Sequence, residues 1–139
     1  MPKLALISIT LNAVIFAVLL PYLEMNNSHL FNPEWPAHAR LHEAWQLSTN
    51  AALSILALAL VWTNRAAQIG VSIALIICFS FLLSWASAST YGGSMLRSDG
   101  THIAAVGGIN AAVLIVIFLT TLLLFGYRSI VVATKDDSI

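Results

Sequence analysis

Charged residues are scarce in this sequence. Only 9% of its 139 residues are charged, whereas soluble domains carry about 25% charged residues. This scarcity excludes a water-soluble globular domain, and an apolar content of 59% excludes a disordered chain. Six Lys and Arg residues balance six Asp and Glu residues, with no basic patch. The balance argues against a nucleic-acid partner.

Cysteine and proline are scarce as well. The single cysteine, Cys78, lies in an apolar run, so no disulfide can form within the chain. Its expected role is that of a small buried or lipid-facing side chain. Of the four prolines, Pro21 is expected to end the first helix, and Pro33 and Pro36 are expected to keep the next segment extended.

Four long stretches contain no charged residue at all. They cover residues 4–23, 44–64, 66–96 and 100–127. A helix needs roughly 20 apolar residues to cross a bilayer. The sequence therefore predicts an all-α, integral membrane four-helix bundle that forms a single transmembrane domain. Its helices are expected at about residues 4–20, 41–62, 69–91 and 103–127.

Four crossings place both termini and the link at residues 63–68 on the same side of the membrane. Four of the six basic residues fall on that side: Lys3, Arg65, Arg128 and Lys135. Because Lys and Arg accumulate in cytoplasmic loops, we expect both termini to face the cytoplasm, at a bacterial inner membrane or its equivalent. All four histidines and four of the six acidic residues then lie on the opposite side. Any chemistry is expected there.

Residues 31–45 hold the densest group of functional side chains. His38 and His42 are four residues apart, which places both on one face of a helix. From His42 and Glu43, a polar stripe continues through Gln46 and Asn50 toward the middle of the bilayer. Because lipid cannot satisfy polar side chains, this stripe should face the interior of the bundle.

The other helices offer polar side chains to the same interior. Ser84 and Tyr91 share one face of the third expected helix, and Asn110 lies on the fourth, beside small residues. We therefore predict a polar pocket, open to the extracytoplasmic side, for a lipophilic or amphipathic molecule. Its expected residues are His42, Glu43, Gln46, Asn50, Ser84, Tyr91 and Asn110, framed by Trp45 and Trp85, with Trp35, His38 and Arg40 at the entrance. Helix packing would also account for the serines, and an interfacial aromatic belt for the aromatic residues.

Three functions are compatible with this pocket. In the first, His42 and Glu43 act as a catalytic acid–base pair on a lipophilic substrate, in an isomerase-like or cyclase-like reaction, and Arg40 clamps an anionic group. In the second, the chain is a non-catalytic subunit that binds another membrane protein. In the third, His38, His42 and His102, with Glu24 or Glu43, hold a metal ion or haem. The sequence identifies no cofactor, and its small helix residues leave homo-oligomerisation open.

The run Asn32-Pro33-Glu34-Trp35-Pro36-Ala37-His38-Ala39-Arg40-Leu41-His42 resembles a motif of a family of uncharacterised small four-helix membrane proteins, a domain of unknown function. The resemblance implies the same four-span fold. It points to Trp35, His38, Arg40 and His42 as the positions to test, and it implies no activity. Sterol-isomerase-like membrane proteins offer a weaker similarity of architecture, since they keep histidine and carboxylates in a bundle pocket.

Overall fold

The structure is a computed structural model that describes residues 1–96 and 104–136. Within these residues, four helical segments are long and apolar enough to cross a membrane. They are Lys3–Glu24, Ala37–Trp62, Ala67–Ala86 and Ala111–Lys135. The prediction of four membrane-compatible helices is confirmed.

The first span continues through Pro21, where the sequence predicted a helix end. It consists of α1 (Lys3–Val14), a π-helical turn (Ile15–Leu19) and α2 (Leu20–Glu24). In the π-helical turn the Leu20 amide donates to the carbonyl oxygen of Ile15, five residues back. Because Pro21 has no amide hydrogen, the Ala17 carbonyl loses its usual donor, and the wider turn accommodates the proline ring. The chain therefore stays helical to Glu24.

The second and third spans are α3 (Ala37–Trp62) and α4 (Ala67–Ala86). α3 begins directly after Pro36, whose fixed φ suits a helix start. α4 ends well before the predicted end at Tyr91, and a 3-10 turn, Ala88–Thr90, follows it. Ser87 Oγ donates to the Leu83 carbonyl at 2.7 Å. Ser87, Ser89 and Thr90 follow in close succession there, and residues of this type favour turns over the interior of a helix.

A hairpin stands where the sequence predicted the start of the fourth helix. β1 (Ala105–Val106) pairs antiparallel with β2 (Ile109–Asn110). Gly107 and Gly108 form the turn, with φ values of 59° and 81°. A two-residue type I′ turn needs positive φ at both positions, which glycine adopts without strain. The last span, α5 (Ala111–Asp136), consequently begins later than the predicted range 103–127, and it also extends beyond the end of that range.

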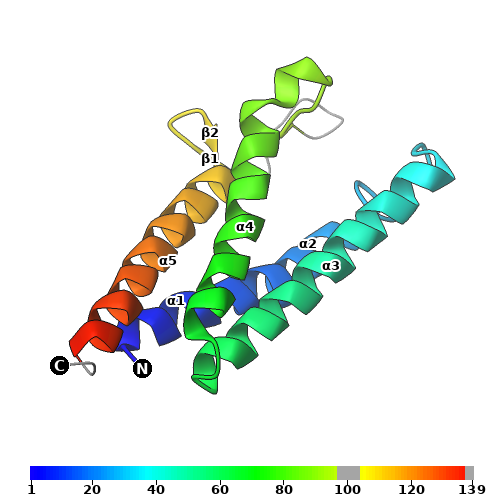
Figure 1. Cartoon of the computed structure of the whole chain (residues 1–139). Helices are drawn as coiled ribbons and strands as arrows, with labels where there is room; N and C mark the ends of the chain where they lie inside the picture. The colour runs from blue at the N-terminus through cyan, green and yellow to red at the C-terminus, as the bar shows by residue number, and fades with distance from the viewer. Residues whose placement is uncertain (97–103, 137–139) are drawn as a thin grey trace.

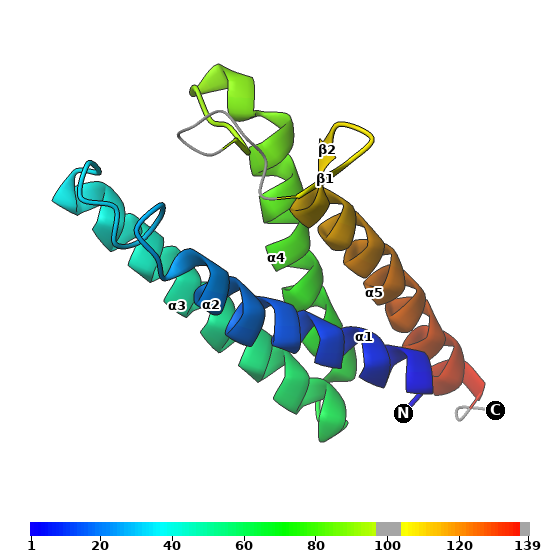
Figure 2. The same cartoon turned by 180° about the vertical axis from the view of Figure 1, so that it is seen from behind.

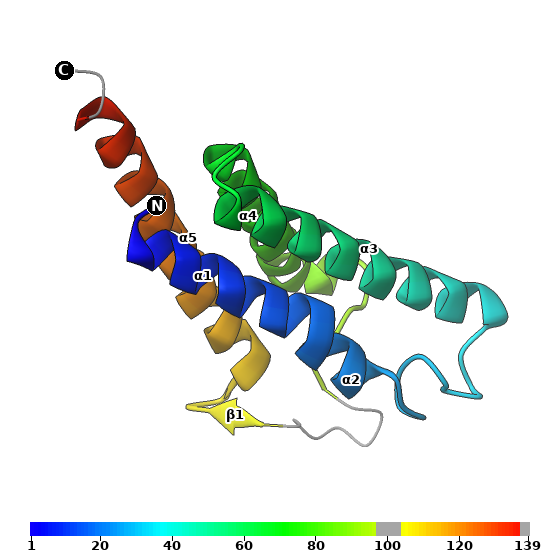
Figure 3. The ribbon, with the colours of Figure 1, turned by 90° about the horizontal axis from the view of Figure 1, so that it is seen from below.

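The four spans pack as a ring in which α1 and α4 each contact both α3 and α5. Figure 3 shows α1 between α3 and α5. Both termini lie at one end of the bundle, as does the α3–α4 link, and we call this the terminal end (Figure 1). The segment 25–36 and the hairpin lie at the opposite end, the loop end. Fully buried apolar side chains from all four spans fill the core, among them Ile9, Val61, Val71, Leu119 and Leu123.

Glycine brings the helices close together toward the terminal end. A Cβ atom on Gly70 of α4 would lie 2.7 Å from the Ala57 carbonyl oxygen of α3. A Cβ atom on Gly126 of α5 would lie 2.7 Å from Ser8 Oγ of α1. Only glycine permits the helices to approach this closely at these two positions. Toward the loop end, α3 and α4 diverge (Figures 1 and 2).

Candidate functional site

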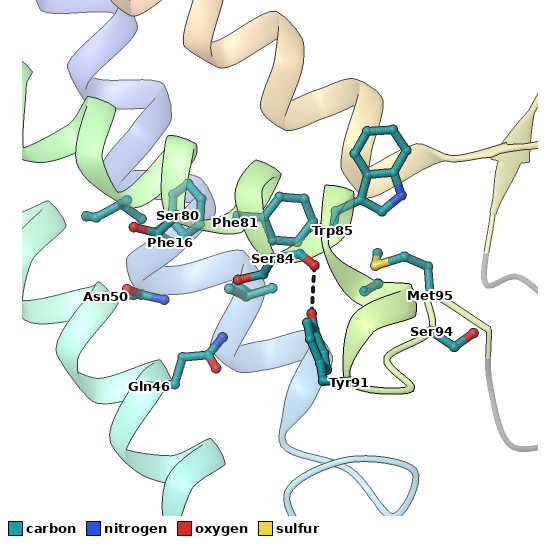
Figure 4. Close-up of a pocket in the computed structure, with 13 residues that line it drawn as sticks. Phe16, Gln46, Asn50, Ser80, Phe81, Ser84, Trp85, Tyr91, Ser94 and Met95 are labelled. Atoms are coloured by element: carbon teal, nitrogen blue, oxygen red, sulfur yellow. Dashed lines mark hydrogen bonds between the residues drawn. The ribbon is translucent and has the colours of Figure 1, made fainter.

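A cavity of about 590 Å³ lies between the first span, α3 and α4, in the half of the bundle nearer the loop end. Its apolar walls include Phe16, Leu20, Ile77, Phe81, Trp85 and Met95, and its polar walls are Gln46, Asn50, Ser80, Ser84, Tyr91 and Ser94. Figure 4 shows the two α3 amides on one side of the cavity and the α4 serines on the other. Among residues 1–96 and 104–136, no lining residue carries a formal charge.

Most of the polar groups on the helical walls have no protein partner. Within residues 1–96 and 104–136, the side chains of Gln46, Asn50, Ser80 and Ser84 form no hydrogen bond to another residue. Tyr91 differs, because its hydroxyl donates to the Ser84 carbonyl at 2.6 Å (Figure 4). Each polar group left unsatisfied in hydrocarbon costs several kcal/mol. The amides and hydroxyls of these walls are therefore available to form hydrogen bonds with water or with a ligand.

Four of the predicted pocket residues line this cavity: Gln46, Asn50, Ser84 and Tyr91. Trp85, which was expected to frame the pocket, also lines it. Ser80 also lines the cavity. Helical spacing places it on the same face of α4 as Ser84, one turn away, but it was not among the predicted pocket residues. Sequence reasoning also missed Phe16 and Leu20, because their position depends on the π-helical turn in the first span.

His42 is not among the residues that line the cavity. Its Nε2 atom lies 3.0 Å from Nε2 of His38, and both side chains are exposed. Its ring also stacks on Trp45, with ring centroids 5.8 Å apart and planes at 29°. We call His38, His42 and Trp45 the imidazole cluster. These residues lie together on the surface of the first turns of α3, whereas Gln46 and Asn50 of the same helix line the cavity.

Glu43 belongs to a second group of side chains, which joins the segment 25–36 to α3. His29 Nε2 lies 3.1 Å from Glu24 Oε2. Glu43 interacts electrostatically with both of these residues. Trp35 packs edge-on against the His29 ring, with centroids 6.2 Å apart. The predicted catalytic pair is thus split, with His42 in the imidazole cluster and Glu43 in this group.

Asn110 lies at the end of β2, immediately before α5, and not on a helix as predicted. Its Oδ1 atom accepts a hydrogen bond from the Ala112 amide at 2.9 Å, which caps α5. Its Nδ2 atom donates to the carbonyl of Met95 at 3.3 Å. Asn110 therefore contacts a residue that lines the cavity but does not line it itself.

The described residues do not bring together the full ligand set that the sequence suggested for a metal ion or haem. Nowhere in residues 1–96 and 104–136 do three or more His, Cys, Asp or Glu side chains gather closely enough to hold a metal. His102, the third histidine of that interpretation, lies outside the described residues. Arg40 is half-buried and forms no ion pair with Glu43 within the same ranges.

Most of the chain matches a known protein family. A family model, Family of unknown function (DUF6640), matches residues 7–128. The chain is a member of DUF6640. The match extends into all four spans and confirms the predicted membership of an uncharacterised family. No curated protein and no solved structure matches this DUF6640 chain.

Proposed function

We propose that this DUF6640 protein is an integral membrane protein that binds a neutral amphipathic molecule in the cavity between the first span, α3 and α4. The observation that carries the proposal is a set of partnerless amides and hydroxyls facing an apolar wall. At about 590 Å³, the cavity is within the usual range for small-molecule sites. A lipid-like molecule with a hydroxyl, carbonyl or ester group would fit both kinds of wall.

The absence of charge on the described part of the cavity wall supports a neutral ligand. A charged group would be taken out of water there without an opposite charge to pair with, which is costly. The amides of Gln46 and Asn50 and the hydroxyls of Ser80 and Ser84 can each both donate and accept. Such groups suit an uncharged oxygen function, while the aromatic wall suits a hydrocarbon body.

The geometry favours binding over acid–base catalysis in the cavity. Among the residues that the structure describes, Tyr91 is the one titratable side chain on its wall, and its hydroxyl already donates to the Ser84 carbonyl. His42 is one helical turn, about 6 Å, along α3 from Gln46. A molecule within the cavity therefore meets hydrogen-bonding groups without a proton donor and acceptor pair.

We also infer that the terminal end faces the cytoplasm of a bacterial cell or its equivalent. Lys3, Arg65, Arg128 and Lys135 belong to that end, whereas Arg40 belongs to the loop end. Basic residues near helix ends favour the cytoplasmic side. The cavity then occupies the extracytoplasmic half of the bundle.

Analysis of co-purifying lipids tests the proposed ligand. Ser84→Leu removes a hydroxyl and fills the cavity from α4, whereas Ser72→Leu makes the same change on α4 outside the cavity. Native mass spectrometry of chains purified in mild detergent should detect a neutral lipid-like mass on the wild-type protein and on Ser72→Leu. Ser84→Leu should lower its occupancy at least tenfold. Equal occupancy in both variants would contradict the proposal.

Two added lipids test the charge preference. Dioleoylglycerol should bind the wild-type protein and bind Ser84→Leu at least tenfold more weakly. Dioleoylphosphatidylglycerol, with the same chains and an anionic headgroup, should bind both proteins equally, as a lipid of the surrounding shell does. If Ser84→Leu weakens the binding of both lipids by the same factor, the neutral-ligand proposal is wrong. If neither binds and another membrane protein co-purifies, the subunit interpretation replaces it.

A further inference from the structure

We propose that His38 and His42 form a binding site for a divalent transition-metal ion on the loop end of α3. The Nε2 atoms of these exposed side chains lie 3.0 Å apart, close enough for a single ion to contact both nitrogens. Neither residue lines the cavity. The metal site and the proposed ligand site can therefore be tested separately.

The distance between the two nitrogens suits a shared metal ion. Imidazole nitrogens bind zinc at about 2.0–2.1 Å, and we take a similar length for copper and nickel. Two donors 3.0 Å apart then subtend roughly 94° at the metal for bonds of that length. This is close to the angle between neighbouring ligands in the square-planar and tetragonal geometries of Cu²⁺ and Ni²⁺. Among divalent ions of this series Cu²⁺ binds such ligands most tightly.

The helix backbone holds the two imidazoles in register. The sequence His38-Ala39-Arg40-Leu41-His42 places the histidines at positions i and i+4, one above the other on one face of α3. Zinc-binding helices use the same histidine spacing with a glutamate directly after the first histidine as general base. Alanine occupies that position here, so the spacing supports metal binding without that hydrolytic base.

The two imidazole rings are nearly perpendicular, with an interplanar angle of 86° and centroids 4.5 Å apart. Without a metal, neutral imidazoles at this distance can share one proton between the two Nε2 atoms. A metal ion would instead take the lone pair of each nitrogen. The close contact is therefore compatible with both states, and a titration distinguishes them.

The electrostatic surroundings favour a cation. The loop end carries Glu24, Glu34 and Glu43 against Arg40 within the described ranges. An excess of negative charge raises the local concentration of cations. No third protein ligand from residues 1–96 and 104–136 joins the pair. The remaining coordination positions would be open to water or to a donor group from a bound molecule.

Trp45 provides a built-in reporter for this site. Its ring stacks on the His42 ring at a centroid distance of 5.8 Å. A paramagnetic Cu²⁺ ion on His42 should quench the fluorescence of this neighbouring indole. The Trp45→Phe variant should lose this component of the quenching while keeping the metal.

The test uses the full chain in detergent without a polyhistidine tag. Cu²⁺ titration followed by fluorescence, and Ni²⁺ titration followed by calorimetry, should each show one saturable ion per chain. His38→Ala and His42→Ala should each weaken binding at least tenfold. His29→Ala is the matched control, since this histidine pairs with Glu24, and it should leave the affinity unchanged.

Several results would overturn the proposal. Binding that survives both His38→Ala and His42→Ala would place the ion elsewhere, and binding lost with His29→Ala would place it beside Glu24. No saturable binding to the wild-type chain would mean that the two imidazoles only share a proton. Helical circular dichroism checks that each variant is folded, and the Trp45→Phe calorimetry checks the stoichiometry independently of fluorescence.

Discussion

At the scale of single residues, polar side chains in the middle of the bundle stand out. Asn12 of α1 and Ser54 of α3 are both fully buried. Among the described residues, neither Asn12 Oδ1 nor Ser54 Oγ has a hydrogen-bond partner. Asn12 Nδ2 lies 3.9 Å from Cys78 Sγ, and sulfur is a weak acceptor. These groups lower the stability of the bundle, because a buried unsatisfied polar group costs about 1–3 kcal/mol.

Ser54→Ala should therefore stabilise the protein. The substitution removes a buried hydroxyl without a partner and keeps the small volume, so we expect the free energy of unfolding to rise by about 1 kcal/mol. Thermal or denaturant unfolding in detergent measures the change. Ser8→Ala is the matched control, since Ser8 is also fully buried but its Oγ donates to the Ala5 carbonyl at 3.1 Å. If Ser54→Ala lowers the free energy of unfolding more than Ser8→Ala does, water or another group satisfies the Ser54 hydroxyl.

At the scale of elements, the start of α5 is tied to the rim of the cavity by one side chain. Asn110 caps the helix through its bond to the Ala112 amide and holds Met95 through its amide nitrogen. An Asn that caps a helix contributes about 0.5–2 kcal/mol relative to Ala. The two roles use different atoms of the same side chain and can be separated by substitution.

Asn110→Ala should remove both roles, and Asn110→Asp only one. We expect Asn110→Ala to destabilise the protein by about 1 kcal/mol. Asn110→Asp keeps an oxygen acceptor at the helix start, where a negative charge is favourable. Its loss of stability should therefore be smaller than that of Asn110→Ala. Both variants lose the donor to the Met95 carbonyl and should hold the co-purified lipid less tightly. Thermal unfolding and native mass spectrometry measure the two effects, and identical unfolding of both variants would contradict the capping role.

The four spans could be predicted from the sequence, whereas their ends could not. Uninterrupted apolar stretches identify a membrane-compatible helix whatever its neighbours are. The first span passes Pro21 because a π-helical turn absorbs the missing amide, which hydropathy does not register. The hairpin at 105–110 has strands of two residues, too short for a periodic pattern. The Gly107-Gly108 pair was its one available signal, since such pairs favour two-residue turns.

At the scale of the whole molecule, the candidate site was only partly predictable. Ser84 was found because it follows the face of a single helix, and Gln46 and Asn50 because they follow another. Whether two such faces meet depends on how the helices pack, which is set by close contacts such as Gly70 against Ala57. His42 is rotated about 40° from Gln46 around α3. It also lies one helical turn, about 6 Å, nearer the loop end, and it is not among the residues that line the cavity.

The arrangement of the bundle also makes its orientation measurable. Asn27 lies at the loop end and Thr63 in the link at the terminal end, and both are exposed. Cys78, the single native cysteine, is fully buried, so the wild-type chain is an unlabelled background for thiol reagents. Each position can therefore carry a new cysteine without removal of a basic residue that could influence the topology.

We expect Asn27→Cys to react with a membrane-impermeant maleimide on intact cells, and Thr63→Cys to react only after the cells are opened. The reason is that four basic residues at the terminal end favour its retention in the cytoplasm. Gel mobility of the labelled chain gives the readout, and the wild-type chain measures background. The reverse pattern would turn the cavity and the imidazole cluster toward the cytoplasm, where both would meet cytoplasmic ligands and metal ions. Labelling of both positions on intact cells would contradict the four-span topology, because the two ends must then share one side of the membrane.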